Sequence, residues 1–315
     1  MSRLTLSVLG TFQAISAEQP ITHFRSANNQ GLLVYLALQS DRPHARELLA
    51  ALFWPEEAEA NARNNLRQSL YQLRKLLGDL ATSAQPYLLV TRQTVQFNPA
   101  SDFKLDVQQF LQAVDAGDLE TAVALYPGDL LPGFPCGSRE FEAWLRQMRE
   151  SLHTLALETM LVAARDCLRH GRYAQAQALA RQQLALEPWR EQAHRQLMEA
   201  LVLAGDRANA LQQFALCRSV LWEELGIAPA PETAALFADI QAGRIGAVTA
   251  AETIRPPLKI RHNLPAFTTE LVGRELEIAQ IGQLLTQDRQ RLVSIVGPGG
   301  MGKTRVGVAV GETLL

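Results

Sequence analysis

The residues that most clearly predict chemistry lie near the C-terminus, in segment 297–304. Its sequence, GPGGMGKT, is a complete phosphate-binding loop of the pattern G-x-x-x-x-G-K-[ST]. In such a loop the backbone N–H groups surround nucleotide phosphates, the lysine adds a positive charge and the final hydroxyl binds magnesium. The predicted nucleotide-binding residues are therefore Gly297, Gly299, Gly300, Gly302, Lys303 and Thr304, and Thr304 is a magnesium ligand only with nucleotide bound. ATP with magnesium is the cofactor that this loop could bind in a complete module.

The context of the loop predicts that this module is incomplete. The apolar run at 291–296 (RLVSIV) predicts a strand before the loop, and LVGRELEIAQIGQLL predicts the start of a helix. Neither the further strands of a sheet nor the acid that would complete magnesium coordination follows within the 315 residues. A single strand cannot bury both of its faces. We therefore expect no ATP hydrolysis and at most weak nucleotide binding, and we expect the chain to be the front part of a longer regulator.

A second group of residues predicts contact with a polyanion. Residues 60–92 hold five cations and one anion, Asp79, in a chain of net charge −2. Their polar side chains suit DNA, since arginine pairs with guanine or phosphate, Asn and Gln pair with adenine, and Tyr reaches phosphate. The candidate DNA-binding residues are Arg63, Asn64, Arg67, Gln68, Tyr71, Arg74, Lys75, Arg92, Gln93 and Thr94. A helical domain with an ordinary solvated face is the alternative.

Other chemistries find no support in the pattern. There is no Ser-His-Asp, Cys-His or paired-carboxylate arrangement, so no enzyme activity is predicted for this chain, although a longer form could be an ATPase. Three cysteines without a C-x-x-C pair predict neither a zinc site nor a disulfide framework. No apolar run approaches the roughly 20 residues of a membrane span. We therefore expect a cytoplasmic protein that has no membrane partner.

The elements that must position the basic residues are three helices and a hairpin. Residues 4–15 predict strands that turn at Gly10, and helices are predicted over 25–39 and 44–54. The third helix, within 56–79, carries one apolar stripe and ends at Gly78; the stripe comprises Ala58, Ala62, Leu66, Leu70, Leu73 and Leu77. Two short strands around the tip 92–94 follow. This order predicts a winged helix-turn-helix, whose third helix enters the major groove of double-stranded DNA.

Residues 105–243 predict an all-helical domain with an internal repeat. Gly171 and Gly205 lie 34 residues apart, as do Ala176 and Ala210. This is the tetratricopeptide period, in which small residues let paired helices pack closely. The segment 116–126 resembles an earlier, degenerate copy. Stacked helical repeats present an extended surface for protein partners.

The segment LLVYLAL…RPHARELLAALFWPEEAEANARNNLRQSLYQLRKLLGD resembles the DNA-binding domain of the SARP-type (antibiotic-regulatory) bacterial transcriptional activators, a winged helix of the OmpR/PhoB type. Tyr126, Gly128, the run 131–134, Phe141 and Trp144 resemble the bacterial transcriptional activation domain of the same family. The resemblance implies self-association on DNA and contact with RNA polymerase. One departure is that 28–30 (NNQ) stands where such proteins often have a basic residue entering the first helix.

The tail completes the predicted organisation. LVGRE together with GPGGMGKT resembles the start of the STAND or NB-ARC signalling ATPases, which several large SARP-type regulators carry next. The predicted domains are 1–100 (winged helix), 105–243 (tetratricopeptide-like activation domain), 244–269 (linker) and 270–315 (incomplete P-loop segment). The predicted fold class is mostly α with N-terminal strands and a truncated α/β end. A sequence-specific transcriptional regulator is favoured over a nucleotide-driven switch with an N-terminal scaffold and over a helical-repeat adaptor.

Overall fold

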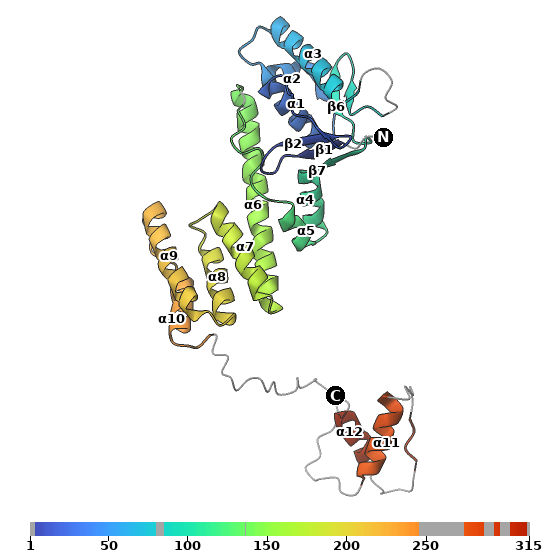
Figure 1. Cartoon of the computed structure of the whole chain (residues 1–315), viewed down its shortest axis with the longest axis vertical. Coiled ribbons are helices and arrows are strands. Elements are labelled where there is room, and N and C mark those ends of the chain that lie inside the picture. The colour runs from blue at the N-terminus through green and yellow to red at the C-terminus, as the bar shows by residue number, and fades with distance from the viewer. Residues whose placement is uncertain are drawn as a thin grey trace. The chain divides into compact units, whose positions relative to one another are not determined.

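The computed structural model describes residues 4–79, 85–135, 137–245, 274–286, 293–296 and 303–313 (Figure 1). The chain divides into two compact units, one within residues 1–247 and one within residues 248–315. None of the helices in the described ranges is long and apolar enough to cross a membrane.

The first unit opens with a small mixed sheet. Its strands are β1 (Leu4–Ser7), β2 (Gln13–Ser16), β3 (Gln19–Pro20) and β7 (Phe103–Leu105), in the order β3-β2-β1-β7. β1 pairs antiparallel with β2 and parallel with β7, so the end of the first hundred residues returns to the N-terminal strand. The predicted turn at Gly10 is confirmed, with φ at +77°, a conformation that glycine adopts without strain.

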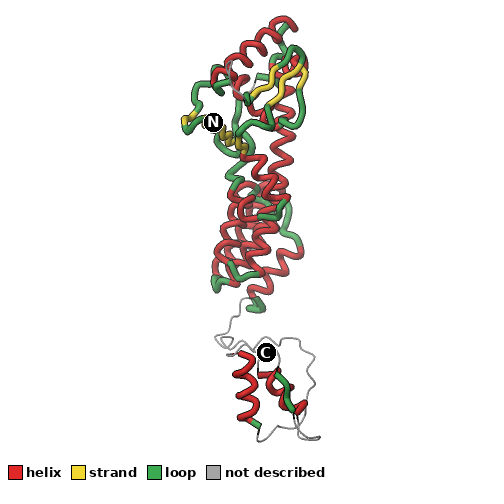
Figure 2. Tube along the Cα trace, turned by 90° about the vertical axis from the view of Figure 1, so that its right-hand side faces the viewer, coloured by secondary structure: helices red, strands yellow, loops and turns green. Residues whose placement is uncertain are grey.

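Three helices and a wing follow this sheet. They are α1 (Ala27–Leu38), α2 (Arg46–Phe53) and α3 (Glu59–Leu76), and the wing comprises β5 (Leu88–Val90) and β6 (Thr94–Phe97). A third strand that the sequence did not predict, β4 (His44–Ala45), pairs with β6 and gives the order β4-β6-β5. The expected second helix therefore begins two residues later, at Arg46, because 44–45 is extended. Figure 2 shows the strands confined to one end of this unit.

The apolar stripe of α3 is buried as predicted, with one exception. Ala62, Leu66, Leu70, Leu73 and Leu77 are buried in the core. Ala58 is exposed, because it is the cap residue that precedes the first turn of α3 and does not belong to the helix. Gly78 follows the helix with φ at +76°, which confirms the predicted stop.

A long helix, α6 (Arg139–Arg169), contacts α2 and packs against the helix that follows it. Its first turns carry Phe141 and Trp144, whose rings lie 4.9 Å from Phe53 of α2 and 4.7 Å from Tyr35 of α1, respectively. A Cβ placed on Gly31 of α1 would lie 3.2–3.4 Å from atoms of three aromatic rings, so the absence of a side chain lets these rings pack close to α1. The two aromatic residues therefore pack α6 against α1 and α2.

Further contacts tie the helical part to the N-terminal sheet. β7 leads directly into α4 (Asp106–Asp115), and α5 (Leu119–Ala124) follows. The Asp106 carboxylate accepts hydrogen bonds from the N–H groups of Val8 and Leu9 at 2.7 and 2.8 Å. Leu130 forms an isolated bridge with Leu9. The expectation of a wholly helical 105–243 is therefore wrong at Leu105, the last residue of β7, and at this bridge, because both complete the N-terminal sheet region.

The helical repeat is arranged as the 34-residue period predicts. Successive helices pack against one another: α7 (Tyr173–Leu186), α8 (Glu191–Leu203), α9 (Arg207–Leu225) and α10 (Pro231–Gln241). Gly171 and Gly205 end helices with φ at +71° and +88°, and Ala176 and Ala210 are fully buried between helices. Alanine recurs at this position of the repeat because each repeat buries one small residue against the neighbouring repeat.

The second unit contributes two described helices that pack together, α11 (Glu275–Thr286) and α12 (Lys303–Thr313). Val306, Val308 and Val310 of α12 are buried. The predicted helix before the loop is confirmed. The predicted strand is not present over its described part, 293–296, because none of the described residues of this unit pairs with it. Residues 246–273, which include most of the predicted linker 244–269, and the loop 297–302 lie outside the described residues, so the predictions about them remain untested.

Candidate nucleic-acid interface

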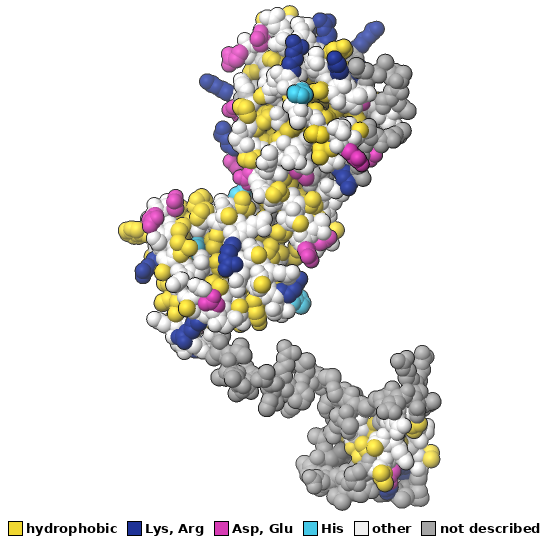
Figure 3. Space-filling model, viewed as in Figure 1, with side chains coloured by type: hydrophobic (Ala, Val, Ile, Leu, Met, Phe, Trp, Pro, Cys, Tyr) yellow, Lys and Arg dark blue, Asp and Glu magenta, His cyan; other side chains and the backbone are white. Residues whose placement is uncertain are grey.

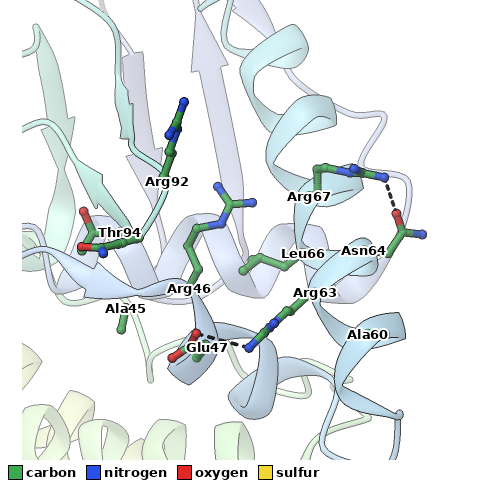
Figure 4. Close-up of a pocket in the computed structure, with 11 residues that line it drawn as sticks. Ala45, Arg46, Glu47, Ala60, Arg63, Asn64, Leu66, Arg67, Arg92 and Thr94 are labelled. Carbon is green, nitrogen blue, oxygen red and sulfur yellow. Dashed lines mark hydrogen bonds and ion pairs between the residues drawn. The ribbon is translucent and has the colours of Figure 1, made fainter.

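The predicted basic residues border an open cleft of about 720 Å³ (Figure 4). Arg63, Asn64 and Arg67 reach it from α3, and Arg92, Gln93 and Thr94 reach it from the tip of the wing. The structure thus brings together six of the ten predicted residues from two segments that are about 25 residues apart. Ala45, Arg46 and Glu47, at the start of α2, form the third side. Figure 3 shows basic side chains on this end of the first unit.

Arg46 fixes the wing beside the helices. Its backbone N–H donates to the carbonyl of Gln93 at 2.9 Å, and its guanidinium donates to the carbonyl of Thr91 at 3.3 Å. The Thr91 hydroxyl in turn accepts the N–H of Thr94 at 2.9 Å, which closes the turn. The wing tip is therefore held at the N-terminus of α2, the end at which the helix dipole favours an anion.

Arg67 occupies the centre of the basic surface. Its guanidinium donates to the side-chain oxygen of Asn64 at 2.7 Å, so the neutral amide orients the arginine without cancelling its charge. On its other side, Arg67 borders a smaller groove of about 300 Å³ with Gln68 and Tyr71. Arg25, just before α1, also lines this groove. It supplies a basic residue at the start of the first helix, where 28–30 has none.

Arg63 is in a different electrostatic environment. Its Nη2 lies 3.3 Å from an oxygen of Glu47 and 2.5 Å from an oxygen of Glu59. Both carboxylates are on the surface, and Glu47 lines the cleft itself. Arg63 is thus already paired with two acids on this surface, unlike Arg67.

The last turn of α3 serves the structure of the wing. The guanidinium of Arg74 donates to the carbonyl of Asp79 at 3.1 Å, and Lys75 is exposed outside both grooves. The carboxylate of Asp79 accepts the N–H groups of Tyr87 and Leu88 at 2.9 and 2.8 Å. Burial raises the pKa of Asp79 while these bonds oppose that shift. Asp79 therefore connects the end of α3 to the start of β5.

Sequence reasoning missed three residues of this surface: Arg25, Arg46 and Glu47. The charge count considered only residues 60–92, whereas these residues precede that window. A basic residue at or near the start of each of the first two helices was the available signal for Arg25 and Arg46. No sequence signal placed Glu47 beside Arg63, which lies 16 residues further along and in another helix.

The predicted nucleotide-binding residues lie mostly outside the described part of the chain. Gly297, Gly299, Gly300 and Gly302 lie outside the described residues, and Lys303 and Thr304 are the first two residues of α12. α12 begins at Lys303, as a phosphate-binding loop requires of the helix that follows it. Within the described ranges, no group of three or more His, Cys, Asp or Glu side chains could hold a metal ion.

Comparison with known families identifies the helical part. Residues 105–241 match the family model of the bacterial transcriptional activator domain. The chain is 28% identical over 324 residues to the regulatory protein AfsR of Streptomyces griseus, an alignment that covers 98% of this chain and 32% of that protein. It is 29% identical over 310 residues to AfsR of Streptomyces coelicolor, covering 90% of this chain and 30% of that one. The chain thus spans about a third of the length of these two relatives.

Smaller regulators are also similar to this chain. The transcriptional regulatory protein EmbR of Mycobacterium tuberculosis is 25% identical over 252 residues, which cover 74% of this chain and 62% of EmbR. A solved structure of EmbR, in complex with a low-affinity phosphopeptide, superposes with a TM-score of 0.60 at 22% identity, over 77% of this chain and 66% of that one. This likeness shows that the two chains share a fold.

Proposed function

We propose that this chain, a bacterial transcriptional regulator of the SARP type similar to AfsR and EmbR, acts by sequence-specific binding to double-stranded DNA. In this proposal α3 enters the major groove and the wing contacts the backbone or the minor groove. Exposed polar side chains of α3 face the bases, and arginines from α2 and the wing contact phosphates. DNA binding needs no cofactor.

The observation that carries this proposal is the convergence of three arginines at one cleft. Arg46, Arg67 and Arg92 come from α2, α3 and the wing, and all three line it. Three separate elements supply cations to one concave surface in a chain of net charge −2. A helix face that is merely solvated has no need of such convergence. A groove bordered by arginines focuses the field on a polyanion.

The experiment measures duplex affinity as a function of salt. Labelled duplexes selected from a random pool, and one unrelated duplex, are titrated with the full chain between about 50 and 300 mM salt. Arg46→Gln combined with Arg92→Gln removes two phosphate contacts, so the slope of log K against log salt should fall by about 1.8. Arg181→Gln combined with Arg218→Gln is the matched control, since both arginines are exposed on the helical repeat. Equal effects of the two pairs would refute the proposed surface.

We propose that the helical repeat provides the output, through self-association on DNA or contact with RNA polymerase, and that this output is activation. Support comes from the match of residues 105–241 to the bacterial transcriptional activator domain. Sedimentation of the chain with duplexes that carry one or two half-sites measures self-association. In vitro transcription from a selected site measures activation. A chain that binds DNA but changes neither readout would contradict this part.

A second proposed function is nucleotide binding by 297–304, the role that a signalling switch would require. It is supported by the start of α12 at Lys303 and by the packing of α12 on α11. Calorimetric titration of ATP with magnesium tests it, because Lys303→Ala removes the charge that meets the phosphates. Tight ATP binding that depends on Lys303 and alters DNA affinity would favour a nucleotide-driven switch. Weak binding without an effect on DNA favours the DNA-binding regulator.

A further inference from the structure

The cleft contains an acid that a surface for DNA does not obviously need. Four arginines line it, and Glu47 is the one carboxylate among the lining residues. Glu47 extends from the first turn of α2 toward Arg63 of α3, and Figure 4 draws the ion pair between them. A carboxylate at this place repels phosphates, so its position calls for an explanation in terms of DNA recognition.

The geometry around Arg63 gives one guanidinium two carboxylates. Glu47 and Glu59 both approach the same Nη2 atom, at 3.3 and 2.5 Å. One guanidinium thus faces two carboxylates, so the formal charge of the three side chains together is −1. They are also open to solvent, since Arg63 is 53% exposed and the two glutamates are 75% and 78% exposed. DNA can therefore reach this cluster, and the two carboxylates repel the phosphates of the approaching DNA.

We infer that Glu47 and Glu59 mask Arg63 and thereby weaken the sequence-independent attraction of this surface for DNA. This inference rests on the proposed function. Non-specific binding is supplied by phosphate neutralisation, which a masked arginine does not provide. Arg67 differs because its partner, Asn64, is neutral and leaves the positive charge available. The two arginines thus have separate roles: Arg67 attracts DNA, and the Arg63 cluster raises specificity by lowering the affinity for unrelated sequences.

The test compares Glu47→Gln/Glu59→Gln with the full wild-type chain on an unrelated duplex. Release of one arginine should steepen the slope of log K against log salt by about 0.9. The double variant should then bind the unrelated duplex about eightfold more tightly than the wild type at 0.1 M salt. Arg63→Gln should change non-specific affinity little in the wild type and should reverse the gain in the double variant. Glu150→Gln/Glu158→Gln, two exposed glutamates of α6, is the control of equal charge change. Melting curves establish that each variant is folded.

The outcomes separate the masking from the proposed function. A gain no larger than that of the control pair overturns the inference, as does a loss of affinity confined to the selected duplex, which would mean that Glu47 accepts a hydrogen bond from a base. Elution from heparin supplies a readout without DNA. Later elution of Glu47→Gln/Glu59→Gln than of the wild type, together with no duplex binding by any form, would support the masking and reject the proposed function.

Discussion

Phe141→Ala tests whether the winged helix depends on the helical part of the chain. Phe141 is fully buried near the start of α6, although its main partners lie in the first hundred residues and in the loop before α6. Its ring centroid is 4.9 Å from that of Phe53, 5.3 Å from that of Trp144 and 6.3 Å from that of Phe134. The same buried cluster continues from Leu4 of β1 to Met160 of α6. Shortening the Phe141 side chain to alanine should therefore destabilise the first hundred residues and the helical part together.

The magnitude follows from the burial and the ring contacts. Replacing a buried phenylalanine with alanine costs about 3–5 kcal/mol, because the transfer free energy is lost and a cavity remains. Three aromatic neighbours favour the upper part of this range, since each such pair adds about 0.5–1.5 kcal/mol beyond its buried area. Total stabilities are about 5–15 kcal/mol. A unit of this size loses about 2–4 °C of melting temperature per kcal/mol, so we expect a decrease of about 8–20 °C.

The assay combines a thermal melt with DNA binding at several temperatures. DNA affinity of the Phe141→Ala variant should disappear at the temperature where its circular dichroism changes. Phe214→Ala is the matched control, because Phe214 stacks on Phe237 at 4.2 Å in a separate cluster of α8, α9 and α10. That variant should retain full DNA affinity below its melting transition. The reasoning is refuted if Phe141→Ala lowers the melting temperature of the helical part while DNA binding persists up to the melting temperature of the wild type. In that case the first hundred residues and the helical part are energetically independent.

Four further changes test separate residues. Leu70→Ala should destabilise the first unit by roughly 2–5 kcal/mol through a cavity in the α3 stripe, and an unchanged melting curve would contradict its burial. Arg67→Ala should weaken the selected duplex by about 1–3 kcal/mol if it reads a base, or all duplexes with a smaller salt slope if it contacts phosphate; unchanged affinity on every duplex and at every salt concentration would contradict both. Burial lowers the pKa of His194, whose ring bonds to the carbonyl of Pro188 and to Gln213. Because the unfolded chain takes up the proton first, the wild type should lose stability as the pH falls below about 6.5. His194→Gln should lack this loss in denaturant titrations at several pH values. Lys303→Ala should leave duplex affinity unchanged in the binding assay, and a measurable loss would link the loop to DNA recognition.

The sequence determined the elements whose pattern is local. The stripe from Ala62 to Leu77 on α3, the two strands around the tip 92–94, and the paired positions Gly171 and Gly205 all occupy the predicted places. Such patterns survive in the sequence because a helix or strand buries one face, and the spacing of apolar residues records that face directly. The same spacing placed the polar side chains of α3 on the opposite face.

Only the tertiary structure decided how these elements meet. The pairing of β7 with β1, the addition of β4 to the wing, and the contact of Phe141 with Phe53 join segments that are distant in the sequence. The approach of Arg46 to the wing and of Glu47 to Arg63 depends on the angle between α2 and α3, which no local spacing records. Residue types alone therefore predicted a basic face, whereas the packing of helices against one another decided which arginines are available and which are already paired with acids.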